Sequence, residues 1–246
     1  RARRDADEAI QQVAELQRQQ REVQRDVRGL PTSGAERAEA IDRLRERKNQ
    51  MTETVQELER NLDQAAANSR ADNPEAGREL LERLMPHFDV LIENFRPGVM
   101  QRLGLGADAL TERFPRLIYC GISGFGAEGP YRDRPGFDQI AQGMSGFMSL
   151  TGTPDSGPTR AGIAIGDLLG GIFAAHGIQL ALLARERSGR GQIVHTSLLE
   201  AMVATLSWGA GMYFESGRAP GPAGQHHPLS SPYGRFRARD GYLNIA

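Results

Sequence analysis

The chain has 246 residues, which suits one or two domains, and its 30 basic and 31 acidic side chains leave a formal net charge of -1. This balance gives no general attraction to nucleic acid or to an anionic membrane, so neither is expected as a partner. The one cysteine, Cys120, excludes an internal disulfide framework. The charged N-terminal residues contain no apolar segment typical of a signal peptide, so we expect a cytoplasmic protein.

Residues 1–72 differ in composition from the rest of the chain. They contain no aromatic residue, one proline and two glycines, whereas aromatic residues, glycines and prolines are frequent from Phe88 onward. This step predicts two domains, a helical hairpin over residues 1–72 and an α/β domain over residues 73–246.

The first domain is predicted to be an antiparallel coiled-coil hairpin. Residues 29–34 (GLPTSG) carry turn residues between the two helices. The 14 basic and 15 acidic residues of 1–72 are mixed, which argues against a nucleic-acid surface. Two roles of the hairpin stay open. It could serve for packing or dimerisation, or it could be an extended arm that contacts a partner. In the second helix, apolar residues recur at alternating three- and four-residue steps: Ile41, Leu44, Met51, Val55, Leu58, Leu62 and Ala65.

The second domain alternates helices with strands. Asn73 and Pro74 are expected as the N-cap and first residue of a helix that continues to residue 85. An alternating order predicts an α/β fold with an incomplete open, largely parallel sheet. Strands are expected over residues 88–93, 117–123 and 193–196, helices over 97–104, 107–114, 138–150, 167–187 and from 197 to about 214, and a terminal hairpin that turns at Asp240 and Gly241.

The end of the first strand carries candidate binding residues. In open α/β sheets, ligands bind beyond the carboxyl ends of the strands. Asn94, Phe95 and Arg96 stand at such an end, and a helix that begins at Pro97 and carries Arg102 follows them. A helix N-terminus and two arginines suit a phosphate or a nucleotide. A polar turn without a ligand fits the same residues.

The end of the second strand runs into a glycine-rich loop. Gly124, Gly126 and Gly129 have the spacing of a dinucleotide fingerprint. The fingerprint requires a helix to follow, and Pro130 and the residues after it break any such helix. We therefore expect no dinucleotide site of this kind.

Asp167 is the one charged residue between Arg160 and Arg185. The residues around it are apolar and rich in glycine, and the run over residues 167–184 is expected to be a buried helix rather than a membrane span. As a helix N-cap, Asp167 would contribute about 1 kcal/mol. As a nucleophile at a helix N-terminus, it would attack an activated carbonyl. The pattern alone leaves both roles open.

Three stretches, residues 89–106, 115–152 and 160–192, resemble the class III coenzyme A transferases, whose superfamily also holds the α-methylacyl-CoA racemases. The resemblance spans about residues 73–246. It implies that Asp167 attacks an acyl-CoA thioester, forms an aspartyl-acyl anhydride and passes coenzyme A to a small carboxylic acid. It also implies a homodimer, no metal, and contacts with coenzyme A at Asn94, Phe95, Arg96, Arg102, Gly136, Phe137 and Asp138.

Phe137 separates the two branches of the superfamily. The resemblance implies that a racemase has a histidine there, which shares the α-proton of the substrate with the aspartate. Phe137 supplies no such base, so transfer is favoured over racemisation. A third hypothesis from another class is an interaction protein, in which the hairpin carries an inactive remnant of a CoA-transferase.

The resemblance also shows departures from the family. The family's first strand–helix unit and its smaller later domain have no counterpart here, and the hairpin stands where the first unit is expected. We therefore expect a fragment of a longer protein, a fusion or a degenerate relative. Unpaired sheet edges and an exposed apolar face should follow.

Overall fold

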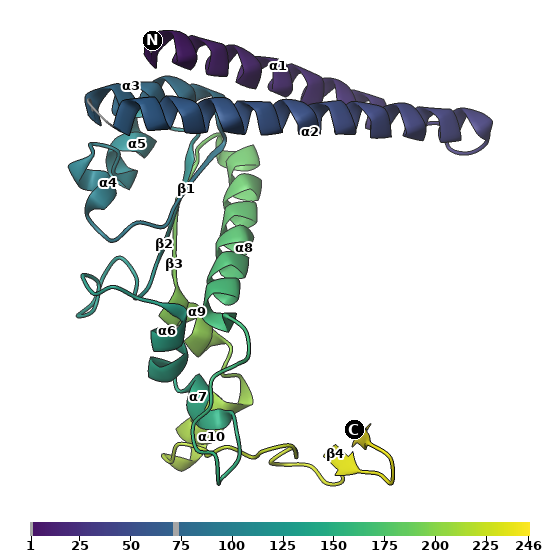
Figure 1. Ribbon diagram of the computed structural model, residues 1–246, viewed down its shortest axis with the longest axis vertical. Coiled ribbons are helices and arrows are strands. Elements are labelled where there is room, and N and C mark those ends of the chain that lie inside the picture. The colour runs from purple at the N-terminus through teal and green to yellow at the C-terminus, as the bar shows by residue number, and fades with distance from the viewer. Residues whose placement is uncertain (1, 71–73) are drawn as a thin grey trace. The chain divides into compact units, whose positions relative to one another are not determined.

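A computed structural model describes residues 2–70 and 74–246, with side chains over residues 7–61 and 77–246 (Figure 1). The predicted N-cap Asn73 lies outside the described residues. The chain divides into two compact units, Arg1–Asp89 and Val90–Ala246. Each unit has its own core and is described by itself.

The first unit is a helical hairpin with a third helix packed on it. Helices α1 (Ala2–Arg28) and α2 (Ala35–Arg70) form the predicted hairpin, and α3 (Pro74–Leu84) and the 3₁₀ turn η1 (Met85–His87) follow. Packing groups α3 with the hairpin, although composition divides the chain at residue 72. Buried residues from α1, α2 and α3 form one core: Ala9, Val13, Leu58 and Leu84, with Ile10, Leu16 and Leu80 against them.

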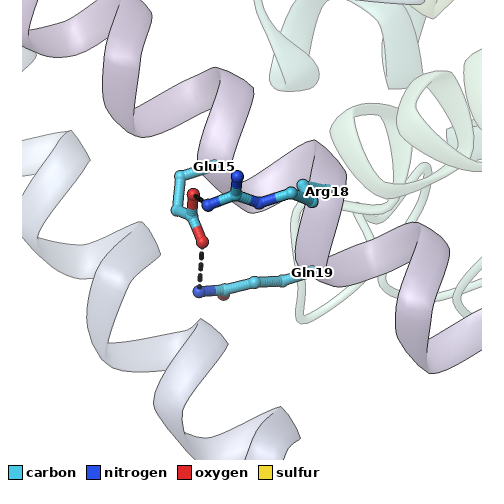
Figure 2. A network of polar contacts seen from close by, with 3 residues as sticks. All are labelled: Glu15, Arg18 and Gln19. Atoms are coloured by element: carbon cyan, nitrogen blue, oxygen red, sulfur yellow. Dashed lines mark hydrogen bonds and ion pairs between the residues drawn. The ribbon is translucent and has the colours of Figure 1, made fainter.

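Polar contacts on the hairpin lie mainly at its surface. On α1, the carboxylate of Glu15 accepts hydrogen bonds from Arg18 and from the Nε2 of Gln19, as Figure 2 shows. Arg47 of α2 pairs with Asp26 of α1 at 2.7 Å, with both side chains half exposed. Exposed pairs of this kind contribute about 0–1 kcal/mol each. The hairpin therefore depends chiefly on its apolar core.

The second unit contains the predicted parallel sheet. Its strands are β1 (Val90–Glu93), β2 (Ile118–Ser123) and β3 (Ile193–Ser197), in the order β1-β2-β3 with both pairings parallel. Central β2 begins with four buried residues, Ile118 to Gly121, as a continuous apolar run in a parallel strand predicts. The carboxyl ends of the three strands therefore meet at one edge of the sheet.

One face of this sheet is covered by α8 (Ile165–Ser188), which runs along β2 and β3 (Figure 1). A methyl group added at Gly170 would lie 2.8 Å from Leu198 and 3.9 Å from Ile122, so the helix packs closely here. Side chains alternate along a strand, so Glu93 and His195, which flank Gly121, face away from α8. Helices α4 (Val99–Arg102) and α5 (Ala107–Arg113) complete the first half of the unit.

Two predicted helices are each broken into two. Residues 138–150 form α6 (Asp138–Met144) and α7 (Phe147–Leu150), because Gly146 has a left-handed φ of 86°. Residues 198–216 form α9 (Leu198–Ala204) and α10 (Trp208–Ser216), with Ser207 at a φ of 50° between them. The C-terminal hairpin of β4 (Gly234–Arg237) and β5 (Tyr242–Ile245) forms as predicted.

The prediction that the apolar run of α8 is buried is wrong for this chain. Among the described helices, α8 alone is long and apolar enough to cross a bilayer, a test that core helices of soluble proteins also pass, and only 17% of its most apolar window is buried. One side packs on the sheet, and the other side is exposed in the described part of its unit. As predicted, Gly189 ends the helix in the left-handed region. The exposed large apolar residues of α8 are Leu168, Ile172, Phe173, Leu180 and Leu183.

Candidate active site

A cavity of about 670 Å³ opens at the carboxyl ends of β1 and β2. Its wall comes from the two strand ends, the segment before α6 and the first turns of α8 and α9. It brings together residues as far apart in the sequence as Asn94 and Leu198. Six of the eight predicted site residues line it: Asn94, Phe95, Arg96, Gly136, Phe137 and Asp167.

The turn after β1 is held by hydrogen bonds at both sides. The Asn94 amide donates to the backbone oxygen of Ile122 at 2.7 Å, and the backbone N–H of Phe95 donates to Glu93 at 2.8 Å. The other oxygen of Glu93 accepts from the Tyr119 hydroxyl at 3.2 Å. Burial, with the Glu93 charge, raises the pKa of Tyr119, so the hydroxyl stays a donor. Glu93 therefore orders the turn, a role that its place inside a short strand did not reveal.

Arg102 lies in a neighbouring cavity of about 510 Å³, which also includes Phe95, Arg96 and Pro97 in its wall. A methyl group at Gly98 would lie 3.2 Å from Nη1 of Arg102, so the guanidinium lies over the turn that carries Arg96. Arg96 lines both cavities and Arg102 lines the smaller one, so the two arginines lie in adjoining walls. Two arginines in one cavity wall suit a phosphate group, and their predicted contact with coenzyme A stays a prediction.

The backbone of the loop crosses the end of β2 at two glycines. A methyl group at Gly124 would lie 2.3 Å from the Cα of Gly136, a separation that no side chain allows. The N–H of Leu199, in α9, donates to the Gly124 oxygen at 3.1 Å and fixes the same crossing. Phe137, next in sequence, is 64% exposed and lines the cavity. The glycine pair therefore fixes the backbone that leads into Phe137.

Asp167 is not the N-cap of α8. The helix begins two residues earlier than predicted, its N-cap is Ala164, and Asp167 occupies the first turn. In the described part of the chain, no group donates a hydrogen bond to its carboxylate. Loss of solvent at this position, and the nearby charge of Asp138, raise the pKa of Asp167. An exposed carboxylate without a donor is free to react.

Asp138 does not line the cavity. Its Oδ1 accepts from the backbone N–H of Gly166 at 2.8 Å, and its Oδ2 accepts from the Gln142 amide at 2.7 Å. Both oxygens are therefore occupied inside the chain. Its predicted contact with coenzyme A stays a prediction.

Sequence reasoning missed two polar residues of the larger cavity, Ser123 and Arg134. The guanidinium of Arg134 stacks over the ring of Tyr131 at 4.3 Å from the ring centre. Arg134 lies in the glycine- and proline-rich loop that follows β2. A basic residue in a loop at the end of a strand was the sequence signal that could have identified it. It adds a second positive charge, beside Arg96, to the wall of this cavity.

The chain is similar to known coenzyme A transferases. It is 45% identical over 170 residues to the succinate–glutarate CoA-transferase of Agrobacterium fabrum, which covers 69% of this chain and 42% of that protein. It is 43% identical over 167 residues to the acetyl-CoA:oxalate CoA-transferase of Acetobacter aceti, which covers 68% and 43%. The chain thus spans less than half the length of these curated relatives.

The comparison with solved structures also finds a relative that is about twice as long as the matched part of this chain. The crystal structure of a CAIB/BAIF family protein from Brucella suis superposes with a TM-score of 0.65 at 43% identity, covering 70% of this chain and 46% of that one. A model of CoA-transferase family III matches residues 36–246. This match covers most of the chain, both cavities and all eight predicted site residues. The chain belongs to CoA-transferase family III.

Proposed function

We propose that the protein containing this chain transfers coenzyme A from an acyl-CoA thioester to a small carboxylic acid, with Asp167 as the nucleophile. The main support for this proposal is the position of the Asp167 carboxylate, which lines the cavity with Asn94, Phe95 and Arg96. No group in the described part of the chain donates a hydrogen bond to it. The names of its relatives, which refer to succinate, glutarate and oxalate, support this substrate class.

The first step is an acyl transfer to Asp167. A carboxylate oxygen attacks the thioester carbon, the C–S bond breaks, and coenzyme A leaves as a thiolate. The product is a mixed anhydride between Asp167 and the acyl group. A carboxylate is a weak nucleophile, so it benefits from a site that removes water and lacks competing donors. The raised pKa of Asp167 accords with partial loss of solvent.

The second step replaces the acyl group. The acceptor carboxylate attacks the carbonyl carbon of the Asp167 side chain, and the donor leaves as a free acid that takes one oxygen from Asp167. The coenzyme A thiolate then attacks the acceptor's carbonyl carbon and releases Asp167. Each cycle therefore transfers one oxygen of the acceptor to Asp167.

The strand-end residues hold the coenzyme in this proposal. Arg96 and Arg102 bind its phosphate groups, and the exposed Phe95 ring packs on an apolar part of it. Gly136 lets the backbone approach closely, while the Phe137 ring borders the acyl group. These roles follow the resemblance and accord with the two adjoining cavities.

Racemisation within the same superfamily is the second candidate. It needs two bases that exchange a proton with the carbon next to the thioester. Among the described residues that line the larger cavity, Asp167 is the one carboxylate, and none is a histidine. Phe137 occupies the position where the resemblance implies the second base. This arrangement favours transfer.

A homodimer is also proposed. Ile172 and Leu183 are exposed, and their spacing of eleven residues places them on one side of α8. An uncovered apolar helix face is typical of a surface that binds another chain. Light scattering should give twice the protomer mass, and Ile172→Glu with Leu183→Glu should lower it. A monomer in the unaltered protein would contradict this assignment.

The proposed chemistry is tested with ¹⁸O. The protein is incubated with acyl-CoA and a panel of carboxylic acids labelled in the carboxylate, including succinate, glutarate and oxalate. We expect a new thioester, and ¹⁸O in the peptide that contains Asp167, by mass spectrometry. Asp167→Ala should abolish both. A new thioester without label in that peptide would contradict the anhydride, and α-proton exchange in deuterated water without transfer would favour racemisation.

A further inference from the structure

Gln142 is a fully buried polar residue outside the cavity, with an exposed fraction of 0%. Its Nε2 donates to Asp138 at 2.7 Å and is 3.4 Å from the backbone oxygen of Ile163, and its Oε1 accepts from the N–H of Ala161 at 2.8 Å. Each end of the amide is thus bonded. A buried amide is costly unless it is satisfied in this way, so the side chain has one preferred orientation.

Asp138 extends this network to α8. Its Oδ1 accepts from the N–H of Gly166, the second residue of α8. The N-cap residue, Ala164, has no side chain that could accept this bond. Asp138 of α6 therefore does from a separate helix what an N-cap side chain does within one.

The hydrogen bonds fix the chain on both sides of the turn that leads to Asp167. Gln142 holds residues 161–163, and Asp138 holds the residue directly before Asp167. A methyl group at Gly166 would lie 3.1 Å from Asp138 Oδ1, so the approach of the two segments is close. A small shift of this turn would move the carboxylate of Asp167 within the cavity.

We propose that Gln142 and Asp138 form a clamp that positions Asp167 for attack on the thioester. Both are positioning residues, since neither lines the cavity. The clamp's effect on catalysis rests on the proposed function. Its effect on the backbone at residues 161–166 does not, so the two can be tested apart.

The test uses a reciprocal exchange of acid and amide. Asp138→Asn places an amide donor against the Gln142 donor, and Gln142→Leu removes that donor together with the acceptor for the Ala161 N–H. Each single variant therefore loses at least one hydrogen bond of the clamp. The double variant Asp138→Asn with Gln142→Glu restores a donor–acceptor pair and keeps acceptors for the N–H groups of Gly166 and Ala161. Gln139→Glu, at an exposed glutamine of the same helix, is the matched control.

Hydrogen exchange of the peptide over residues 160–168 is measured first. We expect exchange roughly 10- to 100-fold faster than in the wild-type protein in each single variant, because a hydrogen bond to a charged group is lost. The double variant and the Gln139→Glu control should exchange at about the wild-type rate. Exchange that stays at the wild-type rate in both single variants would overturn the clamp, whether or not the protein is a transferase.

Steady-state transfer is measured on the same variants. The expected result is a kcat lowered on the order of 100-fold in each single variant, as for a misplaced nucleophile, with little change in the KM for acyl-CoA. The double variant should regain most of the kcat. Faster exchange with an unchanged kcat would overturn the positioning role. An unaltered protein that transfers no coenzyme A would instead overturn the proposed function and leave the exchange data to decide the clamp.

Discussion

Two opposing electrostatic effects act on Asp167. A carboxylate in the first turn of a helix is stabilised by the helix dipole, which lowers its pKa. Loss of solvent and the nearby Asp138 charge act in the opposite direction and prevail, so the pKa is raised. The native protein therefore binds the Asp167 proton more tightly than the unfolded chain does. Ionised Asp167 therefore lowers the stability of the native protein.

This cost predicts a pH-dependent effect of Asp167→Asn. Below about pH 4, near the ordinary pKa of aspartate, both states hold the proton and the cost is absent. As the pH rises through the raised native pKa, the wild-type protein loses stability that the asparagine variant keeps. We expect the urea midpoint of the variant to exceed that of wild type at pH 7 and to approach it near pH 3.5. An equal difference at both values would contradict the raised pKa.

The same shift predicts the acid limit of transfer. Asp167 must be ionised to attack, so the proposed activity should fall, as pH is lowered, at a higher pH than an ordinary aspartate would give. Removing the neighbouring charge with the double variant Asp138→Ala and Gln142→Leu should move this limit to lower pH. The pH profile of kcat/KM for acyl-CoA, which reports the groups of the free enzyme, measures it. A limit that stays in place would mean that Asp138 does not set it.

Glu93 should affect binding of the coenzyme more than the chemical step. In Glu93→Ala, the carboxylate that accepts from the Phe95 N–H and from the Tyr119 hydroxyl is removed, so the turn loses both hydrogen bonds. Losing a hydrogen bond to a charged group costs about 1.5–3 kcal/mol, so we expect the Kd for coenzyme A to rise roughly 10- to 100-fold. Calorimetric titration measures this value. Tyr119→Phe, which keeps the bond to Phe95, should raise the Kd less.

At the scale of elements, the strands followed the sequence more closely than the helices did. The strands expected over residues 88–93, 117–123 and 193–196 match β1, β2 and β3 within two residues. The helix expected over residues 138–150 broke at Gly146, whose left-handed φ a pattern of apolar residues does not record. The start of α8 was also missed, because its first-turn acceptor, Asp138, lies 28 residues upstream.

The crossing of the β2 end and the loop predicts a strong effect of Gly124→Ala. The added methyl group would meet the Gly136 backbone at 2.3 Å, and backbone cannot move aside as a side chain can. We expect a loss of about 3 kcal/mol in the free energy of unfolding, at the upper end for overpacking. Urea denaturation measures it. Gly143→Ala, inside α6 with only an ordinary 3.7 Å contact, should be neutral or stabilising by up to about 1 kcal/mol.

At the scale of the whole molecule, the core of the first unit makes α3 part of the hairpin's stability. Leu84 is 3% exposed in the core formed with α1 and α2, while Leu81 on the same helix is 40% exposed. Leu84→Ala should cost about 2–5 kcal/mol, and Leu81→Ala much less. Circular dichroism of residues 1–89 during urea titration checks this. Equal effects would indicate that α3 does not pack on the hairpin.

By itself the sequence predicted the helical hairpin, the three parallel strands and the family, and these are confirmed, while the role of Asp167 stays a prediction. These depend on local signals, such as apolar periodicity, composition and ordered motifs, which the chain carries in consecutive residues. Only the tertiary structure decided that Ala164 rather than Asp167 caps α8, that Glu93 orders the Asn94–Arg96 turn, and that Asp138 and Gln142 hold the Asp167 turn. These roles depend on hydrogen bonds and a close backbone crossing whose partners folding brings together, so no local pattern contains them.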